Sequence, residues 1–299
     1  MSNALPPPEI DDGNSVPPAG GQPANFSQRR VLLPLILFAA TCYTTYSVYA
    51  APPVSKPVDG LIYAAAIMFT LLCHEFGHFV QAVRCRVPAS LPFFIPMPAS
   101  PIGTMGAVIL MRPYVGDRRA IFDIGITGPL AGLVPSLVFS LIGLQLSHIE
   151  IINPNAPIIR LGEPLIFKAL AYLIFGNLGP NEEVFLHPLA FAGWVGVFIT
   201  ALNLIPIGQL DGGHVLYGLL LRRAYPLMRL TLLGAMVGVF AFGYWGWLIM
   251  ILLLMWMGPL HPPTANDNIE LGTGRTILGW ATLCFVPIGF TPVPFSLGM

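Results

Sequence analysis

One short stretch of the sequence carries residues that could hold a metal ion and move a proton. It reads His74-Glu75-Phe76-Gly77-His78, the pattern HExxH, inside an apolar run long enough to be a helix. Residues four apart lie on one face of a helix, so both imidazoles can reach one ion. Glu75 is one position further round, close enough to act on a water molecule without being a ligand. The pattern therefore predicts a zinc site with Glu75 as its base.

The surroundings of the motif argue for a function independently of its spacing. Glu75 is the only formally charged residue in 61–83, and a carboxylate at mid-membrane costs about 2.5–3.5 kcal/mol on insertion scales. A bound cation would offset that cost. The alternative interpretation is a hydrogen-bonded polar cluster between helices, or a proton relay, and neither needs an ion.

The two histidines need a third partner, because a catalytic zinc ion takes three protein ligands and a water molecule. We expect this partner to be Asp211. Pro206 and Gly212–Gly213 interrupt the helical pattern on either side of it and let its carboxylate turn inward. The competing interpretation is a helix N-cap, a common role of Asp before a helical run. His214 also competes for the metal, and we expect it beside the site and outside the ligand set.

Two further groups near these motifs are expected to have structural roles. Cys73 adjoins His74 but points about 100° away round the helix, which favours packing. Asp123 lies close in sequence to Arg118 and Arg119. We therefore expect Asp123 to pair with one of these arginines and not to bind metal.

The composition indicates which kind of protein holds these residues. The chain has 299 residues, of which 9% are charged and 55% hydrophobic, and 14 basic residues balance 14 acidic ones. A soluble domain carries about 25% charged residues, so we expect a polytopic membrane protein. The zero net charge gives no electrostatic footprint for nucleic acid. Four cysteines do not define a disulfide scaffold at this length.

Apolar runs of about 20 residues predict the membrane-spanning helices. The expected spans are 31–50, 61–83, 120–145, 188–205, 225–242, 245–257 and 276–292. The sixth is short, and Gly243–Tyr244 before it is either a tight turn or a kink, so we expect six to eight helices. Basic residues gather before the first span, after the second and after the fourth. The positive-inside rule then places the metal site toward the cytoplasmic side.

The segment 86–117 is apolar but is not expected to be a continuous helix. Its prolines, which break helices, are Pro88, Pro92, Pro96, Pro98, Pro101 and Pro113. Residues 107–111 read as a short strand. Non-helical backbone at membrane depth must be buried or line a cavity, so we expect a re-entrant loop or small hairpin; a loop lying on the headgroups is the alternative.

Part of this segment is a candidate substrate-binding strand. An edge strand from 103–111 could hold a substrate extended by strand addition. Gly103 and Gly106 would then permit close backbone approach, or they serve only the turn.

Two later positions are expected to support the site. Gly128 and Gly132 have the GxxxG spacing that lets helices approach closely, so we expect their helix to pack against the HExxH helix. Asn203 is a candidate donor to a developing oxyanion; a helix–helix hydrogen bond is the alternative.

These motifs together resemble the site-2 protease family of intramembrane zinc metalloproteases. That family pairs HExxH on one helix with an Asp-Gly aspartate on a later one, as in Leu210-Asp211-Gly212 here. Asn203 and Pro206 match the N-x-x-P stretch before that aspartate, and 122–132 is similar to the intervening core helix. The segments 92–96 and 103–106 resemble in particular the EGY-like branch. No soluble stretch is long enough for the PDZ or CBS domain of many relatives.

The resemblance covers about residues 61–223 and implies a complete site. It implies one zinc ion per chain, held by His74, His78 and Asp211, with Glu75 as the catalytic residue. The implied activity is hydrolysis of peptide bonds in or near transmembrane segments of membrane proteins. A membrane metal-binding protein or transporter is the main alternative, although such proteins usually thread several polar groups through their spans. A prenyl-protein protease and an inactive membrane chaperone are further alternatives.

The expected fold class is an all-α polytopic membrane protein with six to eight transmembrane helices and a small re-entrant β segment near the active site. Residues 1–28, which are rich in Pro, Asn and Gly, are expected to be a disordered tail. Residues 29–299 are expected to form a membrane-embedded protease domain. The acidic tail suits a bacterial cytoplasmic membrane better than a plastid, because transit peptides are basic and poor in acidic residues.

Overall fold

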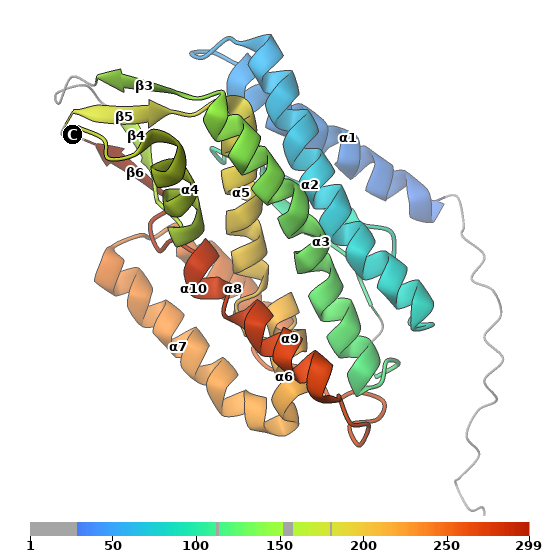
Figure 1. Ribbon diagram of the computed structural model, residues 1–299. Coiled ribbons are helices and arrows are strands. Elements are labelled where there is room, and N and C mark those ends of the chain that lie inside the picture. The colour runs from blue at the N-terminus through green and yellow to red at the C-terminus, as the bar shows by residue number, and fades with distance from the viewer. Residues whose placement is uncertain (1–28, 112–113, 152–157, 180, 299) are drawn as a thin grey trace, which may run out of the picture.

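The structure is a computed structural model, and it describes residues 29–111, 114–151, 158–179 and 181–298. The expected disordered tail, 1–28, lies outside the described residues. The elements are mostly helices, which pack side by side in Figure 1. They are α1 (Arg29–Ala50), α2 (Pro57–Arg84), α3 (Arg118–Gln145), α4 (Leu165–Phe175), α5 (Pro188–Asn203), α6 (Asp211–Leu220), the 3₁₀ turn η1 (Leu221–Arg223), α7 (Ala224–Phe242), α8 (Trp247–Met257), α9 (Thr273–Leu283) and α10 (Val286–Gly289).

Helix α3 is the centre of the bundle, and it packs against α2, α5 and α6. It begins where the side chain of Asp117 accepts a hydrogen bond from the Ala120 amide at 2.8 Å, an N-cap that satisfies one free N–H of the first turn. Helix α2 begins with Pro57, whose fixed φ suits a first helical position. The largest cluster of buried apolar side chains lies between α2 and α5 and includes the fully buried Tyr63 and Trp194.

Among the described residues, four helical stretches are apolar and long enough to cross a membrane: Val31–Ala50, Pro57–Arg84, Arg118–Gln145 and Asp211–Phe242. The last combines α6, η1 and α7, and the positive φ of Leu221 (53°) interrupts it. Shorter apolar helices are Leu165–Phe175, Pro188–Asn203 and Trp247–Met257. The expectation of a single helix over 276–292 is wrong, because α9 ends at Leu283 and the four-residue α10 follows it. Pro287 lacks an N–H and so cannot donate the next hydrogen bond of α9, which interrupts the helix before α10.

The break at 243–244 is a turn. Gly243 ends α7 in the left-handed region, with φ 66°, and α8 begins three residues after Tyr244. Glycine reaches this conformation without a Cβ penalty, which is why it so often terminates helices.

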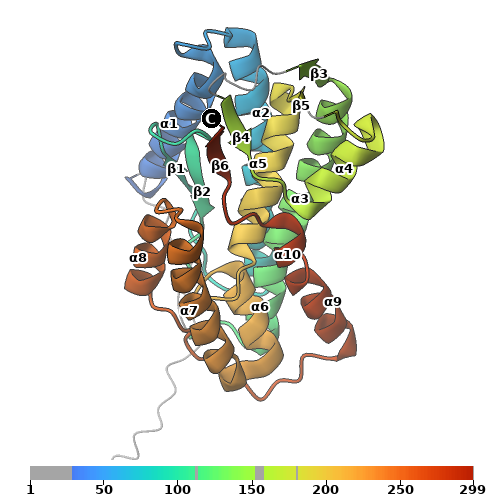
Figure 2. The same ribbon diagram turned by 90° about the vertical axis from the view of Figure 1, so that its left-hand side faces the viewer.

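The segment 86–117 contains an antiparallel hairpin of β1 (Phe93–Pro96) and β2 (Thr104–Val108). The strand expected at 107–111 therefore lies earlier in the chain, and Met111 makes only an isolated bridge with Ala89. Figure 2 shows the hairpin beside α1, against which β1 packs. The hydroxyl of Tyr63 donates a hydrogen bond to the Ile102 carbonyl at 2.8 Å and so ties the hairpin loop to α2.

Two further antiparallel pairs lie near α4, at the opposite end of the bundle from α9 (Figure 1). They join β3 (His148–Ile151) to β5 (Glu182–Phe185) and β4 (Ile158–Leu161) to β6 (Phe295–Gly298). The expectation of one small β segment missed them. Each strand has four residues, too few for a clear alternation, and β4 pairs with a strand more than 130 residues away.

Candidate metal centre

Three side chains from two distant parts of the chain meet in the bundle. Helix α2 carries His74 and His78 one turn apart, and α6 carries Asp211. His74 Nε2 lies 3.1 Å from Asp211 Oδ2, and His78 Nε2 lies 3.2 Å from Asp211 Oδ1. All of the potential ligand atoms lie within 4.8 Å of one another, and both histidines are buried. The structure therefore brings the three expected ligands to one point.

The position of Asp211 follows from the break between α5 and α6. Helix α5 ends at Asn203, before Pro206, and the chain turns through 204–210 before α6 begins. Asp211 is the first residue of α6, and Leu210 occupies the N-cap position without a capping side chain. The N-cap interpretation of Asp211 is thus wrong, and its carboxylate is free to face the histidines.

The two glycines after Asp211 allow this turn to close. A Cβ atom at Gly212 would lie 1.9 Å from the Leu204 carbonyl oxygen, and one at Gly213 would lie 2.2 Å from the Gly208 carbonyl oxygen. Only glycine fits such a close backbone approach. The first turn of α6 therefore rests directly on the loop that precedes it.

The donor set has the chemistry and spacing of a metal site. A tetrahedral ion with bonds of about 2.0–2.2 Å separates its ligand atoms by about 3.3–3.6 Å, close to the observed separations of 3.1 and 3.2 Å. His78 Nδ1 lies 2.7 Å from the Ile124 carbonyl oxygen. A carbonyl only accepts, so Nδ1 donates and the neutral ring turns the lone pair of Nε2 toward Asp211. This is the outer contact that typically orients a metal-binding histidine.

Helix α3 forms the wall behind both histidines. A Cβ atom at Gly128 would lie 2.1 Å from His78 Nε2, and one at Gly132 would lie 2.9 Å from the Cβ of His74. Helix α3 packs on α2 as the GxxxG spacing predicts. The structure also shows that the two imidazoles occupy the space that side chains at Gly128 and Gly132 would fill.

Two other predicted site residues lie at this centre. Glu75 is buried, with 3% of its surface exposed, and is not part of the His-His-Asp group. The side-chain amide nitrogen of Asn203 lies 3.3 Å from His74 Nε2. Asn203 therefore reaches the same centre from the end of α5, across a helix–helix contact.

The two glycines of the hairpin have different surroundings. At Gly103, φ is 77° and a Cβ atom would lie 2.7 Å from the Thr44 carbonyl oxygen of α1. At Gly106, φ is 98° and the nearest atom to a Cβ would be a side-chain carbon of Ile199 at 3.9 Å. Gly103 is thus tightly packed against α1, whereas a Cβ atom at Gly106 would make one ordinary van der Waals contact, with Ile199.

The expected pairing of Asp123 with Arg118 or Arg119 is wrong. Asp123 makes a bidentate ion pair with Arg275 of α9, at 2.7 and 2.9 Å. Arg118 and Arg119 instead donate to backbone carbonyls, among them those of Gly218 and Glu270. Sequence proximity favoured the arginines of the same helix, but only the fold brings Arg275 to Asp123.

Sequence reasoning also missed the partner of His214. His214 Nδ1 lies 2.6 Å from Nε2 of His261, a buried residue of the loop between α8 and α9. Neither belongs to the group of described residues that could hold a metal. Cys73, expected to pack, is half-buried and is likewise outside that group.

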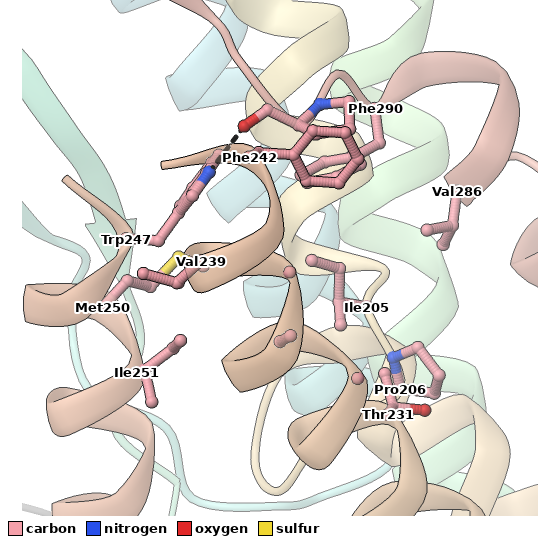
Figure 3. Close-up of a pocket in the computed structure, with 14 residues that line it drawn as sticks. Ile205, Pro206, Thr231, Val239, Phe242, Trp247, Met250, Ile251, Val286 and Phe290 are labelled. Carbon is pink, nitrogen blue, oxygen red and sulfur yellow. Dashed lines mark hydrogen bonds between the residues drawn. The ribbon is translucent and has the colours of Figure 1, made fainter. Parts of the chain in front are cut away.

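An apolar cavity of about 290 Å³ adjoins the loop between α5 and α6. Figure 3 shows Ile205 and Pro206 of that loop facing residues of α7 and α8, among them Val239 and Ile251. Trp247 closes one side, and its indole donates a hydrogen bond to the Pro292 carbonyl at 2.7 Å. The cavity is therefore apolar, and its lining residue Ile205 is two residues after Asn203 in the chain.

These features define a class: a membrane protein built from apolar helices, with a group able to hold a metal ion in its core. The family comparison then identifies the particular family. The model of peptidase family M50 matches residues 62–242, from α2 to α7, which include HExxH and Asp211. The chain belongs to peptidase family M50.

The chain is similar to plant proteins that are named as probable zinc metalloproteases. "Probable zinc metalloprotease EGY1, chloroplastic" of Arabidopsis thaliana is 30% identical over 246 residues, 77% of this chain and 42% of that protein. The rice protein of the same name (Oryza sativa subsp. japonica) is 32% identical over 228 residues, 71% of this chain and 37% of that protein. The chain therefore spans about two fifths of the length of these relatives. No solved structure matches the chain significantly.

Proposed function

We propose that this chain is a zinc-dependent intramembrane endopeptidase that hydrolyses peptide bonds in or near transmembrane segments of membrane proteins. The observation that carries the proposal is the convergence of His74, His78 and Asp211 within 4.8 Å, next to the buried Glu75, in a chain of peptidase family M50. The relatives are named zinc metalloproteases, which supports zinc as the ion.

Each residue has a distinct role in this proposal. The two Nε2 atoms and the Asp211 carboxylate hold zinc, which when bound polarises a carbonyl and lowers the pKa of water. The Glu75 carboxylate takes a proton from the attacking water and returns it to the leaving amine. The Asn203 amide donates a hydrogen bond to the oxygen on which negative charge develops.

The β2 strand supplies a place to hold the substrate backbone. A helical substrate keeps its carbonyls in its own hydrogen bonds, so it must be extended before it can be cut. Among the described residues β2 pairs only with β1, so its second edge can receive a strand. A Cβ atom at Gly106 would make only an ordinary van der Waals contact with Ile199, and this lack of crowding supports such an approach. The packing of Gly103 against α1 favours the turn role for that residue. We propose that the apolar cavity of Figure 3 receives apolar substrate side chains.

The membrane arrangement is part of the same proposal. We propose that residues 29–299 form one protease domain with its core at about 61–223, crossing the membrane six to eight times. In this arrangement the shorter apolar helices also cross and the β1–β2 hairpin is re-entrant. The arginines near the site end of the bundle favour the cytoplasmic side for the metal. A bacterial cytoplasmic membrane is the proposed location; the named relatives are chloroplastic.

Two substitutions at the motif separate metal binding from catalysis. Glu75→Gln keeps the shape of the side chain and removes the base, so we expect zinc content to remain and cleavage of a model transmembrane substrate to fall by about 10²–10⁴-fold. His74→Ala should lose both zinc and cleavage. Glu163→Gln is the matched control, because Glu163 is 62% exposed and pairs with Lys168 at the surface.

The outcome distinguishes the protease from the alternative of a metal-binding protein or transporter. Cleavage by Glu75→Gln at the wild-type rate would refute the protease proposal. Asp211→Asn should weaken zinc binding, because the amide is a poorer ligand than the carboxylate. Unchanged zinc affinity in that variant would move the third ligand elsewhere.

A further inference from the structure

The loop between α8 and α9, residues 258–272, lies across the end of the bundle that carries α6; we refer to it as the strap. Near its start, the Pro259 carbonyl accepts a hydrogen bond from the Gly208 amide at 3.1 Å. Near its end, the Ile269 carbonyl accepts one from Arg118 at 3.4 Å. In Figure 1 the strap lies near the first turn of α3 and leads into α9. It therefore contacts both the loop before Asp211 and the start of α3.

His261, in the first part of the strap, is held in one orientation. The residue is 4% exposed, and its ring stacks on that of Tyr217 with centroids 4.5 Å apart. Its Nδ1 contacts the carbonyl oxygen of Pro262, and Pro262–Pro263 stiffen the backbone at this point. Burial, followed by the neighbouring His214, lowers the pKa of His261 to about 3. The ring is therefore neutral near pH 7.

The contacts of His261 assign the protons on both histidines. The Pro262 carbonyl can only accept, so Nδ1 of His261 carries the proton and Nε2 of the same neutral ring has a lone pair. His214 Nδ1, 2.6 Å away, must then donate its N–H to that lone pair. The chain of contacts fixes both the tautomer and the orientation of His214.

His214 is the first side chain that can anchor the start of α6. Asp211 opens the helix, and the next two residues are glycines without side chains. A Cβ atom at Gly125 of α3 would lie 2.6 Å from the Cβ of His214, so His214 is held between α3 and the strap. A movement of His214 would carry with it the turn on which Asp211 stands.

We propose that His261 is a positioning residue for the metal centre: through its hydrogen bond to His214 it fixes the first turn of α6, and with it the direction of the Asp211 carboxylate. This inference rests on the proposed function for the identity of the ligands. It gives the strap, which lies outside both the HExxH motif and the Asp211 segment, a role in metal binding.

The test uses metal binding by the full chain, without a protease assay. His261→Phe keeps a ring against Tyr217 and removes the acceptor, whereas His261→Gln keeps an acceptor where Nε2 stands. Affinities for Zn²⁺ are measured by competition with a chelator, and the geometry is read from the visible absorption of Co²⁺ added in its place. His148→Phe is the matched control, because His148 lies at the far end of the bundle and its side chain is 66% exposed.

We expect His261→Phe to bind zinc about 10-fold more weakly and to change the Co²⁺ spectrum. This is the low end of the effect of losing a direct partner of a ligand, because His261 acts through His214. His261→Gln should return to within about twofold of the wild-type affinity. Adding His214→Phe to His261→Phe should cost little more, because the two residues act as one unit. Wild-type affinity and spectrum in His261→Phe, no rescue by His261→Gln, or additive losses in the double variant would each overturn the proposal. Cleavage by Glu75→Gln would instead refute the protease and leave this result intact.

Discussion

Replacing Gly128 with alanine tests the metal site through a residue that is not itself a ligand. Alanine is the better helix former by about 1 kcal/mol, so helix propensity alone would predict a more stable protein. In this structure the added Cβ atom would lie 2.1 Å from His78 Nε2. The methyl group and the imidazole therefore compete for one position.

The size of the effect follows from the distances. Real Cβ atoms essentially never approach another heavy atom within 3.0 Å, so the imidazole or helix α3 must move by roughly 0.9 Å. Metal–ligand bonds tolerate deviations of only about 0.2 Å. Losing outer contacts already weakens metal binding by about 10–100-fold, and displacing a ligand should exceed that range. We expect Gly128→Ala to lose more than about 100-fold in zinc affinity.

The assay is zinc affinity by chelator competition, with far-ultraviolet circular dichroism to measure helix content. Gly234→Ala is the matched control, because Gly234 lies inside α7 and a Cβ atom there would meet nothing within 4 Å. It should bind zinc as the wild type does. If Gly128→Ala bound zinc with wild-type affinity while keeping its helix content, the assignment of His78 Nε2 as a ligand would be refuted.

Three further substitutions test the surroundings of the site. Asn203→Ala should keep zinc and lower kcat by about 10²–10³-fold, the usual effect of removing an oxyanion donor; steady-state kinetics showing a change in KM alone would contradict this role. Gly103→Ala meets both a positive φ and the Thr44 carbonyl, so we expect faster hydrogen exchange in 93–108, with zinc affinity unchanged; protection equal to wild type would argue against the packing on α1. Arg275→Gln breaks the ion pair with Asp123. Because Arg275 is 42% exposed, the free energy of unfolding, measured by thermal unfolding, should fall by no more than about 1 kcal/mol. A loss of zinc would show that the pair supports the metal site.

The candidate site could be named from the sequence because its chemistry is local and costly. Two histidines one turn apart with a glutamate between them share a helix face whatever the rest of the fold does. A catalytic zinc ion needs a third protein ligand, and this requirement pointed to Asp211. The structure brings these groups within 4.8 Å. The first three expected spans also match long apolar helices, because hydrophobic length sets which segments can cross a membrane.

The contacts between segments could not be predicted in this way. The partner of Asp123 is Arg275, the partner of His214 is His261, and β4 pairs with β6. Each of these contacts joins segments that lie tens of residues or more apart in the chain. Nearby in sequence, each residue has either a different plausible partner or none. The role of Gly128 likewise depends on which side chain faces it across two helices.

The sequence by itself thus determined the kind of chemistry, the residues able to perform it and the apolar helices that carry them, since residue type, helical period and hydrophobic length are properties of short stretches. Only the tertiary structure decided how the candidate ligands are oriented and what holds them in place. Their orientation depends on how α3 packs against α2 and on how the strap packs against α6. At such contacts a shift of about one ångström decides whether a side chain fits, as at Gly128 beside His78.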